Sequence, residues 1–568
     1  MIVEKIRKTI ADSLKNLGIE VGEITLEHPA DLEHGDFSTN AALVYAKEAK
    51  MKPSKLADKI VEELKDKSLK FVERIEIAGA GFINFYLSPR FFASQIAEII
   101  SKGDNFGEGQ TLADKKVMVE YTDPNPFKEF HIGHLMSNAI GESIARLFEA
   151  SGAKVARACW QGDVGLHVAK AIWGMIQTNN KQQTTNNSKA TVQKWGEAYT
   201  VGSQKYETDE NAKKEINKLN KKIFDRSDTE VNKLYDWGRQ VSLEHFEEIY
   251  KKLGTKFDHY FFESREGREG EKIVAEFLKK GVFEKSENAV VFRGERFGLH
   301  TRVFITSQGL PTYETKELGL NKAKFEKEPD INQSVIVTAN EQNDYFKVVL
   351  KAMEQIYPEI AAKTKHLSHG MLRFASGKMS SRTGNVITGE SLISTMEDLV
   401  LEKIKDREFS PEEKQNIARA VGVGAIKYSI LRSATGSDII YDFEKSISFE
   451  GDSGPYLQYT YARALSVLRK TNLGVGLPSY LGARLPSSLL ERLLYRFPEV
   501  VARAAKEFEP HHIATYLIEL AGAFNNFYAK NKIIGSEEEN YRLALTRAVS
   551  IVLKNGLWLL GMEAPERM

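Results

Sequence analysis

The order of hydrophobic and polar positions divides the chain of 568 residues into four stretches. In the first, residues 1–112, a helical pattern over 55–64 precedes two strand-like runs, Arg74–Ile77 and Phe82–Tyr86, which the turn Gly79-Ala-Gly81 separates. Helical spacing followed by short apolar runs around a glycine turn is typical of a small α+β domain. We therefore predict such a domain at the start of the chain, joined to the rest through residues 103–109.

The second stretch, residues 113–385, alternates strand-like and helical patterns. The strand-like runs are Val117–Tyr121, Val290–Phe292, Val303–Thr306 and Ser334–Thr338. This alternation predicts a parallel sheet wrapped by helices. A charged helical segment at about 170–260 reads as an insertion on that sheet. Within it, residues 177–188 are almost wholly Gln, Asn, Thr and Ser and predict a surface loop.

The remaining residues are dominated by amphipathic helices. Residues 386–448 are predicted to be linking helices, and residues 449–568 an all-helical bundle that includes a helix at Ile513–Tyr528. The predicted fold class is thus a multidomain α/β protein with an N-terminal α+β domain and a C-terminal all-α bundle.

Composition narrows the class of protein. A hydrophobic content of 42% and an aromatic content of 10% permit large cores and exclude a disordered chain. The single cysteine, Cys159, excludes an internal disulfide framework and fits a reducing cytoplasm. The start of the chain carries charge too early for a secretory signal, and no apolar run is long enough for a membrane span. The net charge of +1 does not decide whether nucleic acid is a partner.

Two short strings carry the candidate chemistry. The first, His131-Ile-Gly-His134, opens a segment with apolar residues at helical spacing, so both imidazoles lie on one face at the positive end of a helix. Gly133 leaves that face open, and such a place suits a nucleotide phosphate. The second string, Lys378-Met-Ser-Ser-Arg382, sets two cations around two hydroxyls in a turn-rich stretch. Together they predict that ATP is held between two halves of one site.

Other interpretations of these strings exist. Either string alone is compatible with ordinary surface residues. Paired histidines also bind zinc, but the chain has no H-E-x-x-H motif and no cysteine cluster to complete such a site, so we expect no metal site. A Walker loop is excluded because Met379 follows Lys378 and position 372 is Leu372. The dinucleotide fingerprint is also absent, because the turn at 79–81 lacks its third glycine.

Further blocks of sequence carry a family resemblance. The two strings resemble the HIGH and KMSKS signatures of class I aminoacyl-tRNA synthetases, and Pro124–Leu135 resembles the PNxxKxxHxGHL block of the arginyl-tRNA synthetase family. The chain is similar to that family at further places in the same order: Gly81–Phe85, Gly162–Gly165, Gly309–Glu317, Asn340–Gln342, Gly454–Arg463 and Ala564–Met568. The likeness runs over nearly the whole chain, which is identified as a member of this family.

The resemblance implies a fold and an activity. Residues 113–385 are expected to form a Rossmann-like catalytic domain, 1–112 an added domain for the tRNA elbow, 386–448 stem-contact helices and 449–568 an anticodon-binding bundle. The implied activity is an arginine–tRNA ligase, which forms arginyl-adenylate and pyrophosphate from ATP and arginine and transfers arginine to the 3′ end of its tRNA, releasing AMP. Mg²⁺ accompanies ATP, and no prosthetic group or structural zinc is expected.

The resemblance also assigns residues to the ATP site. The HIGH region comprises Pro124, Asn125, Lys128, His131, Ile132, Gly133 and His134. The residues expected at ATP are His131, Gly133, His134, Met371, Lys378, Ser380 and Ser381. Here Ser381 stands where the usual KMSKS string has its key lysine. Lys128 is therefore expected to be the main transition-state cation, with catalytic help from the two histidines, Lys378 and Arg382.

Arginine and tRNA are assigned in the same way. Arginine is expected at Asn125, Glu263, Tyr313, Glu317 and Gln342, although the family commonly has Asp where Glu317 stands. The alternative is that Tyr313 and Glu317 form an ordinary i,i+4 pair on a helix. The residues expected at tRNA are Phe82, Asn84, Tyr456, Tyr459, Asn526 and Met568. Aromatic residues there can instead pack the bundle core, which we predict for Phe527.

Two rival functions stay open on the sequence alone. One is a small-molecule nucleotidylyltransferase with the same nucleotide-binding fold, against which the long helical tail and the N-terminal domain argue. The other is an RNA-binding relative without catalysis, against which His131, His134 and Lys128 argue. We expect a cytoplasmic monomer that does not bind membranes.

Overall fold

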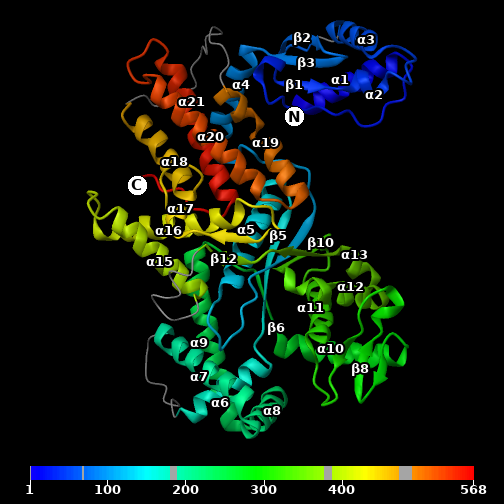
Figure 1. Cartoon of the computed structure of the whole chain (residues 1–568), viewed down its shortest axis with the longest axis vertical. Helices are drawn as coiled ribbons and strands as arrows, with labels where there is room; N and C mark the ends of the chain where they lie inside the picture. Colours follow the sequence, from blue (N-terminus) through cyan, green and yellow to red (C-terminus); the bar gives the residue numbers. More distant parts are fainter. Residues whose placement is uncertain (1, 67–68, 179–187, 376–386, 472–488) are drawn as a thin grey trace. The chain divides into compact units, whose positions relative to one another are not determined.

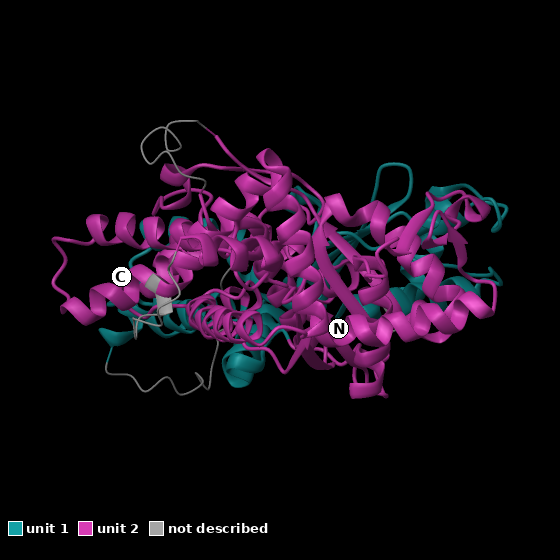
Figure 2. Cartoon of the chain, turned by 90° about the horizontal axis from the view of Figure 1, so that it is seen from below, with its two compact units in different colours: residues 1–107, 463–500, 519–555 teal, residues 108–462, 501–518, 556–568 magenta. Residues whose placement is uncertain are grey.

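The computed structural model describes all residues except 1, 67–68, 179–187, 376–386 and 472–488 (Figure 1). The described residues form two compact units (Figure 2). Unit 1 contains residues 1–107, 463–500 and 519–555, and unit 2 contains residues 108–462, 501–518 and 556–568. Each unit is therefore built from segments that lie far apart in the sequence.

Unit 1 contains the predicted N-terminal α+β fold. Its antiparallel sheet has the strand order β1 (Phe37–Thr39), β3 (Phe82–Leu87), β2 (Val72–Ala78). The hairpin predicted around residues 79–81 is confirmed as β2–β3. The helices of this part are α1 (Ile2–Asn16), α2 (Ala41–Tyr45), α3 (Pro53–Asp66) and α4 (Pro89–Lys102). Their apolar faces share one core with the sheet.

Unit 1 also takes in helical segments from the C-terminal part of the chain. They come from α19 (Leu489–Glu507), α20 (His511–Lys530) and α21 (Glu539–Leu559). Tyr495 on α19 joins the N-terminal core, and Arg492 Nε lies 2.7 Å from an oxygen of the fully buried Asp36. A buried ion pair together with apolar contact thus ties α19 to the N-terminal fold.

Unit 2 is built on a parallel sheet, as predicted. Its five strands follow the order β11 (Thr364–His369), β10 (Gln333–Ala339), β4 (Lys116–Glu120), β5 (Lys154–Gln161), β6 (His259–Phe262). The chain runs outward from β4 through β5 to β6 and then returns on the other side of β4 with β10. This reversal makes the carboxyl ends of β4 and β10 the place where such a sheet holds its ligand.

Two predicted strands of this sheet lie elsewhere. Val290–Phe292 falls in β8 (Ala289–Phe292) and Val303–Thr306 overlaps β9 (Arg302–Ile305); with β7 (Glu284–Ser286) they form a separate antiparallel sheet. The short connections between them explain the difference, because neighbouring parallel strands need a crossover of a dozen or more residues. The other three strands of the parallel sheet, β5, β6 and β11, were not among the predicted runs.

Helices account for most of the rest of unit 2. The helix predicted after His131 is α5 (Ile132–Ala150), and the predicted insertion consists of α6 (Leu166–Gln177), α7 (Ser188–Thr208), α8 (Glu210–Asp225) and α9 (Thr229–Leu253). The others are α10 (Glu263–Lys279), α11 (Tyr313–Lys327), α12 (Asn343–Ile356), α13 (Pro358–Lys363), α15 (Gly389–Lys403), α16 (Pro411–Leu431), α17 (Phe443–Ser446) and α18 (Gly454–Arg469). Strands β12 (Leu372–Phe374) and β13 (Ile439–Tyr441) form a small parallel pair.

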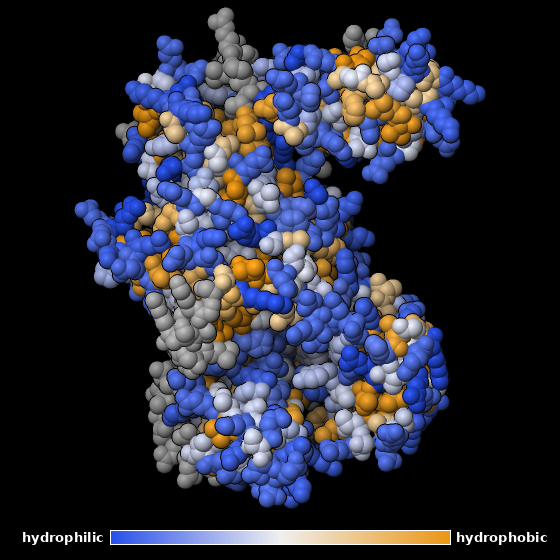
Figure 3. All heavy atoms as spheres, viewed as in Figure 1, coloured by the Kyte–Doolittle hydropathy of each residue, from blue (hydrophilic) through white to orange (hydrophobic). Residues whose placement is uncertain are grey.

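On the face shown in Figure 3, hydrophilic residues predominate and hydrophobic residues form separate groups. Among the described helices, none combines the length and apolar character needed to cross a bilayer.

Candidate active site

A cavity of about 380 Å³ lies at the carboxyl ends of β4 and β10. Its walls come from the segment after β4, the first turn of α5, the starts of α10 and α11, and the segment after β10. The lining residues are Glu120, Thr122, Asp123, Asn125, His131, Gly133, His134, Ser137, Trp160, Gly162, Glu263, Tyr313, Glu317, Val337, Thr338, Ala339, Glu341, Gln342, Tyr345, Phe346 and His369. The cavity thus occupies the position that the sheet topology indicates for a ligand.

The two histidines form the first turn of α5. His131 is the N-cap, and the ring of His134 stacks on the His131 ring with centroids 3.4 Å apart. The backbone N–H of His131 donates to Nδ1 of His134 at 3.3 Å, so the ring proton of His134 lies on Nε2. Burial lowers the pKa of His131 to about 4 and that of His134 well below its usual value, and the charge of Lys128 lowers both further. Both imidazoles are therefore neutral hydrogen-bond donors at neutral pH.

A strained turn connects β4 to α5. Thr122, Asp123 and Phe127 have φ of 80°, 46° and 68°, a region that residues with side chains rarely adopt. Side chains of α5 hold this turn: Ser137 Oγ accepts from the backbone N–H of Thr122 at 2.9 Å, and Asn138 donates to the Thr122 hydroxyl at 3.0 Å. Strain of this kind persists where the surrounding structure fixes it, and it is common at functional sites.

Buried carboxylates form another part of the cavity lining. Glu120, at the end of β4, is ion-paired with Lys324 of α11 at 2.5 Å, and both side chains are buried. Glu317, one turn into α11, is fully buried and accepts from Asn321 at 2.8 Å, while its Oε2 has no hydrogen-bond partner. Burial raises the pKa of Glu317 to about 7, with Lys324 opposing and Glu120 adding to the shift. The pKa of Asp123 is raised as well, first by burial and then by Glu120.

This wall therefore offers negative charge that its own cations do not balance. In the part of the chain that the structure describes, no ion pair reaches Glu317 or Asp123. A buried carboxylate without a cation is costly unless it is protonated or binds a cationic ligand. The cavity is thus suited to a ligand that carries a positive charge on one end.

The start of α10 contributes a third side. Glu263 is buried and ion-paired with Lys316 of α11 at 2.5 Å. Gly162 lies beside it, and a Cβ atom there would lie 2.3 Å from Oδ1 of Asn125 and 3.2 Å from Oε1 of Glu263. Only glycine leaves room for both side chains. The next residue, Asp163, accepts from the backbone N–H of Ser264 at 2.8 Å and thereby fixes the 162–165 loop to α10.

The structure brings together half of the residues predicted for the HIGH region, catalysis, ATP and arginine. Asn125, His131, Gly133, His134, Glu263, Tyr313, Glu317 and Gln342 all line the cavity. Tyr313 is 54% exposed whereas Glu317 is fully buried, so the two side chains lie in different surroundings. Both belong to the wall of the cavity.

Other predicted residues do not line it. The Lys128 ammonium lies 4.7 Å from the ring centroid of Tyr199 on α7. The backbone N–H of Met371 donates to the Asp438 carboxylate, and its carbonyl accepts from the backbone N–H of Ile439. Pro124 and Ile132 are not among the residues that line the cavity. Lys378, Ser380, Ser381 and Arg382 lie outside the described residues.

The residues predicted at tRNA are divided between the two units. Phe82 on β3 is 44% exposed, whereas the neighbouring Asn84 is buried and accepts from the Ser38 hydroxyl at 2.8 Å. Tyr456 and Tyr459 are half-buried on α18, and Asn526 is exposed on α20. Phe527 packs on the small cluster of Val467, Ile533 and Leu543, as predicted. Met568 is the last residue of the chain and half-buried.

Sequence reasoning missed several residues of the site. Glu120, Asp123, Lys324 and His369 are close to the ligand position or bound to residues that line it. One sequence feature pointed to Glu120, because it is an acid within the otherwise apolar run 117–121. A buried charge in such a run needs a partner or a ligand. The other three come together only through the tertiary fold.

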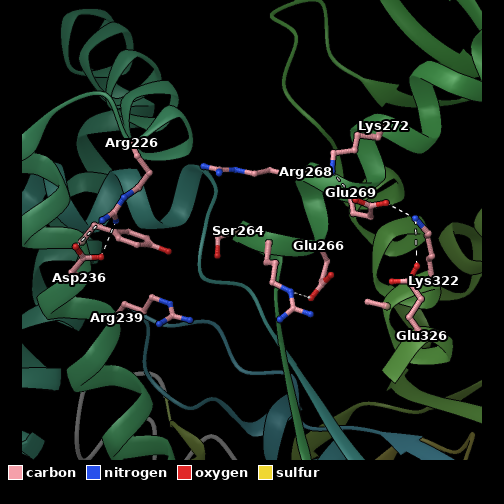
Figure 4. Close-up of a pocket in the computed structure, with 13 residues that line it drawn as sticks. Arg226, Asp236, Arg239, Ser264, Glu266, Arg268, Glu269, Lys272, Lys322 and Glu326 are labelled. Atoms are coloured by element: carbon pink, nitrogen blue, oxygen red, sulfur yellow. Dashed lines mark hydrogen bonds and ion pairs between the residues drawn. The ribbon is translucent and has the colours of Figure 1, made fainter. Parts of the chain in front are cut away.

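A second cavity of about 630 Å³ lies beside the first residues of α10 (Figure 4). Its charged side chains pair with one another, as in Arg226 with Asp236, Arg265 with Glu266 and Lys322 with Glu269. None of the histidines or carboxylates described above lines it. Among the described residues, no group of His, Cys, Asp or Glu has the arrangement of a metal site.

Three models of known protein families match this chain. A family model described as "tRNA synthetases class I (R), catalytic domain" matches residues 95–443. Models described as "Arginyl tRNA synthetase N terminal domain" and "DALR anticodon binding domain" match residues 4–87 and 457–568. The three matches follow one another along the chain.

Individual relatives agree with these matches. The chain is 30% identical to a protein of Clostridium acetobutylicum and 31% identical to one of Clostridium kluyveri, both named arginine–tRNA ligase; the alignments cover 100% and 99% of this chain and 99% and 100% of the relatives. The fold is similar to that of an arginyl-tRNA synthetase from Thermus thermophilus, with a TM-score of 0.81, 23% identity and full coverage of both chains.

Proposed function

The chain belongs to the arginine-specific class I tRNA synthetases, and from that premise we propose how its residues divide the work between ATP, arginine and tRNA. The chain is an arginine–tRNA ligase, which uses ATP to join arginine to tRNA. The observation that carries the proposed division is that the histidine pair and the buried carboxylates line one cavity. One end of that cavity offers neutral N–H donors and the other offers negative charge.

The ATP end is the first turn of α5. His131 and His134 donate N–H groups to phosphate oxygens as negative charge moves onto the departing pyrophosphate. They do so as neutral imidazoles, because burial holds both pKa values below neutral pH. The positive end of the α5 dipole adds to the same effect. Gly133 keeps this surface flat, since a Cβ atom there would lie 3.1 Å from the His131 ring.

The arginine end is the carboxylate wall. A guanidinium presents a planar fork of donors that carboxylates meet best. Glu317 accepts from it, and Glu120, Tyr313 and Gln342 border it. Asn125 and Glu263 hold the α-amino end. The arginine carboxylate then faces the α-phosphate of ATP, attacks it in line and displaces pyrophosphate to give arginyl-adenylate.

Little covalent work falls to the protein in this step, so positioning and charge stabilisation carry the rate. Mg²⁺ enters with ATP as part of the substrate. Lys128, three residues before His131, supplies positive charge once its ammonium leaves the Tyr199 ring. Lys378, Ser380, Ser381 and Arg382 are proposed to close on the pyrophosphate. Met371 is proposed to lie near the adenine through its backbone.

The tRNA contacts are proposed for both units. Phe82 offers an exposed aromatic ring for stacking in the N-terminal domain. Tyr456, Tyr459 and Asn526 are proposed to read the anticodon, and the segment ending at Met568 supports them. We also propose that the enzyme acts as a cytoplasmic monomer, which fits its one buried, unpaired cysteine.

The test is pyrophosphate exchange with each of the twenty amino acids, with and without bulk tRNA. Of the twenty amino acids, we expect only arginine to support pyrophosphate exchange and only arginine to be joined to tRNA. Exchange with another amino acid at a comparable rate, or nucleotidyl transfer to a small acceptor without any charging of tRNA, would contradict the proposal.

A further inference from the structure

The far end of the histidine-bearing helix α5 lies where two other helices end. Helix α9 of the insertion ends at Leu253, and α21, the last helix of the chain, ends at Leu559. The last carbonyls of any helix lack partners within it and carry its partial negative charge. Both sets of carbonyls accept hydrogen bonds from basic side chains, the fully buried Lys427 and the partly buried Arg146.

Each of two cations bridges the two helix ends. Arg146 on α5 donates from Nη1 to the carbonyl of Trp558 at 2.9 Å and from Nη2 to the carbonyl of Gly254 at 3.0 Å. Lys427 on α16 donates from Nζ to the carbonyl of Leu253 at 2.6 Å and to that of Gly561 at 2.7 Å. Both residues therefore join the end of α9 to the end of α21, from two different helices.

The surrounding side chains fix this arrangement. Lys427 is fully buried, and Glu142 of α5 accepts from Arg146 Nε at 2.7 Å. The Ser143 hydroxyl, also on α5, donates to the carbonyl of Leu559 at 2.8 Å. Gly561 has a φ of 67°, and a Cβ atom there would lie 2.9 Å from Lys427 Nζ. The chain after α21 is thus shaped to receive the ammonium.

We propose that Arg146 and Lys427 act as positioning residues that hold α5, and through it the His131–His134 pair, against the joined ends of α9 and α21. This inference rests on the proposed function of the cavity, in which those histidines contact ATP. Neither cation touches the cavity itself. The effect is transmitted along one rigid helix.

The lever arm is set by helix geometry. Twelve residues separate His134 from Arg146, which corresponds to about 18 Å along the helix axis. A tilt of about 3° around the clamped end therefore moves the imidazoles by about 1 Å. Misplacement of that size in a catalytic site can cost about a hundredfold in rate. The carboxylates proposed for arginine lie on β4 and α11, so a tilt of α5 does not move them.

The test uses Lys427→Met, Arg146→Lys and the double variant in the full chain. Lys427→Met keeps the length of the side chain without its donors, and Arg146→Lys keeps the charge without the fork that bridges two carbonyls. The matched control is Arg419→Ala, because Arg419 also reaches from α16 to the C-terminal segment, at Glu563, but makes an exposed ion pair that does not include α9. Active-site titration by the burst of pyrophosphate corrects every rate for the folded fraction.

Each single variant is expected to lower kcat by about tenfold or more and to raise the ATP KM, while the arginine KM stays within about twofold. The kcat of the double variant is expected to be little lower than that of the worse single variant, because both residues hold the same pair of helix ends together. Arg419→Ala keeps wild-type constants. A uniform change in the ATP and arginine KM, or unchanged kinetics with only a lower Tm, would overturn the proposal. A wild-type chain that charges no arginine would instead count against the proposed function.

Discussion

Glu317 provides the sharpest test of the arginine end of the cavity. It is fully buried, one of its oxygens has no hydrogen-bond partner, and no ion pair among the described residues reaches it. We choose Glu317→Gln because it keeps the shape of the side chain and its contact with Asn321. The change therefore removes negative charge and little else.

The magnitude follows from two opposing effects. Removal of the partner of a buried charge typically costs about 2–5 kcal/mol. Here the cost lies at the lower end, because burial raises the pKa of Glu317 to about 7 and the free enzyme already holds it partly protonated near neutral pH. Glutamine also keeps one acceptor for the guanidinium. A loss of about 2 kcal/mol corresponds to an arginine KM raised about 30-fold.

The assay is tRNA charging with arginine and ATP varied separately at pH 7.5. The arginine KM should rise by about this factor, while the ATP KM stays within about twofold because Glu317 is proposed to contact arginine and not ATP. The matched control is Glu314→Gln on the same helix, since Glu314 is also buried but pairs with Arg302 outside the cavity. Equal increases in both KM values, or an equal effect of Glu314→Gln, would refute the assignment of Glu317.

Three further predictions concern the site, the fold and tRNA. The arginine KM should rise as the pH falls through about 7, because protonation of Glu317 removes the charge that the guanidinium needs. This pH dependence should be absent in Glu317→Gln. The neighbouring groups Glu120, Asp123, Lys324 and Tyr345 are the same in both proteins. Gly141→Ala should lower the Tm by several degrees in a thermal melt, since its Cβ would lie 2.3 Å from the buried Tyr121, whereas Gly522→Ala on α20, where a Cβ meets nothing within 4 Å, should not lower it. Tyr456→Ala should weaken tRNA charging and leave ATP binding unchanged in a nucleotide-binding assay; unaltered charging would remove Tyr456 from the anticodon site.

Much of the fold could be predicted because its elements have local causes. The helix after His131 follows from apolar spacing, and the β2–β3 hairpin follows from two apolar runs around a glycine turn. Strand β5 was missed because Lys154, Arg157 and Gln161 interrupt its apolar pattern. The runs in β8 and β9 were recognised as strands but placed in the wrong sheet, because pairing between distant strands leaves no mark in a local pattern.

Residues of the site could likewise be predicted where their cause is local, and could not where it is the tertiary fold. The histidine pair was predictable, because three-residue spacing at a helix start places both rings together whatever the rest of the fold does. The pairing of Glu263 with Lys316 and of Glu120 with Lys324 was not, since each joins segments far apart in the sequence. Lys128 was expected as the main cation, and its ammonium lies on the Tyr199 ring; its catalytic role stays a prediction.

Helix α11 explains how one cavity can be acidic without becoming unstable. The helix carries the acid Glu317 and also the two buried lysines that neutralise acids from other elements, Lys316 for Glu263 and Lys324 for Glu120. Those two pairs hold α11 against α10 and β4, whereas no ion pair among the described residues reaches Glu317, the carboxyl group proposed for the guanidinium. A buried pair that lost its lysine would leave an uncompensated charge, a strongly destabilising change. Under the proposed function, the residues that fix the position of α11 would therefore also determine which carboxyl group meets the guanidinium of arginine.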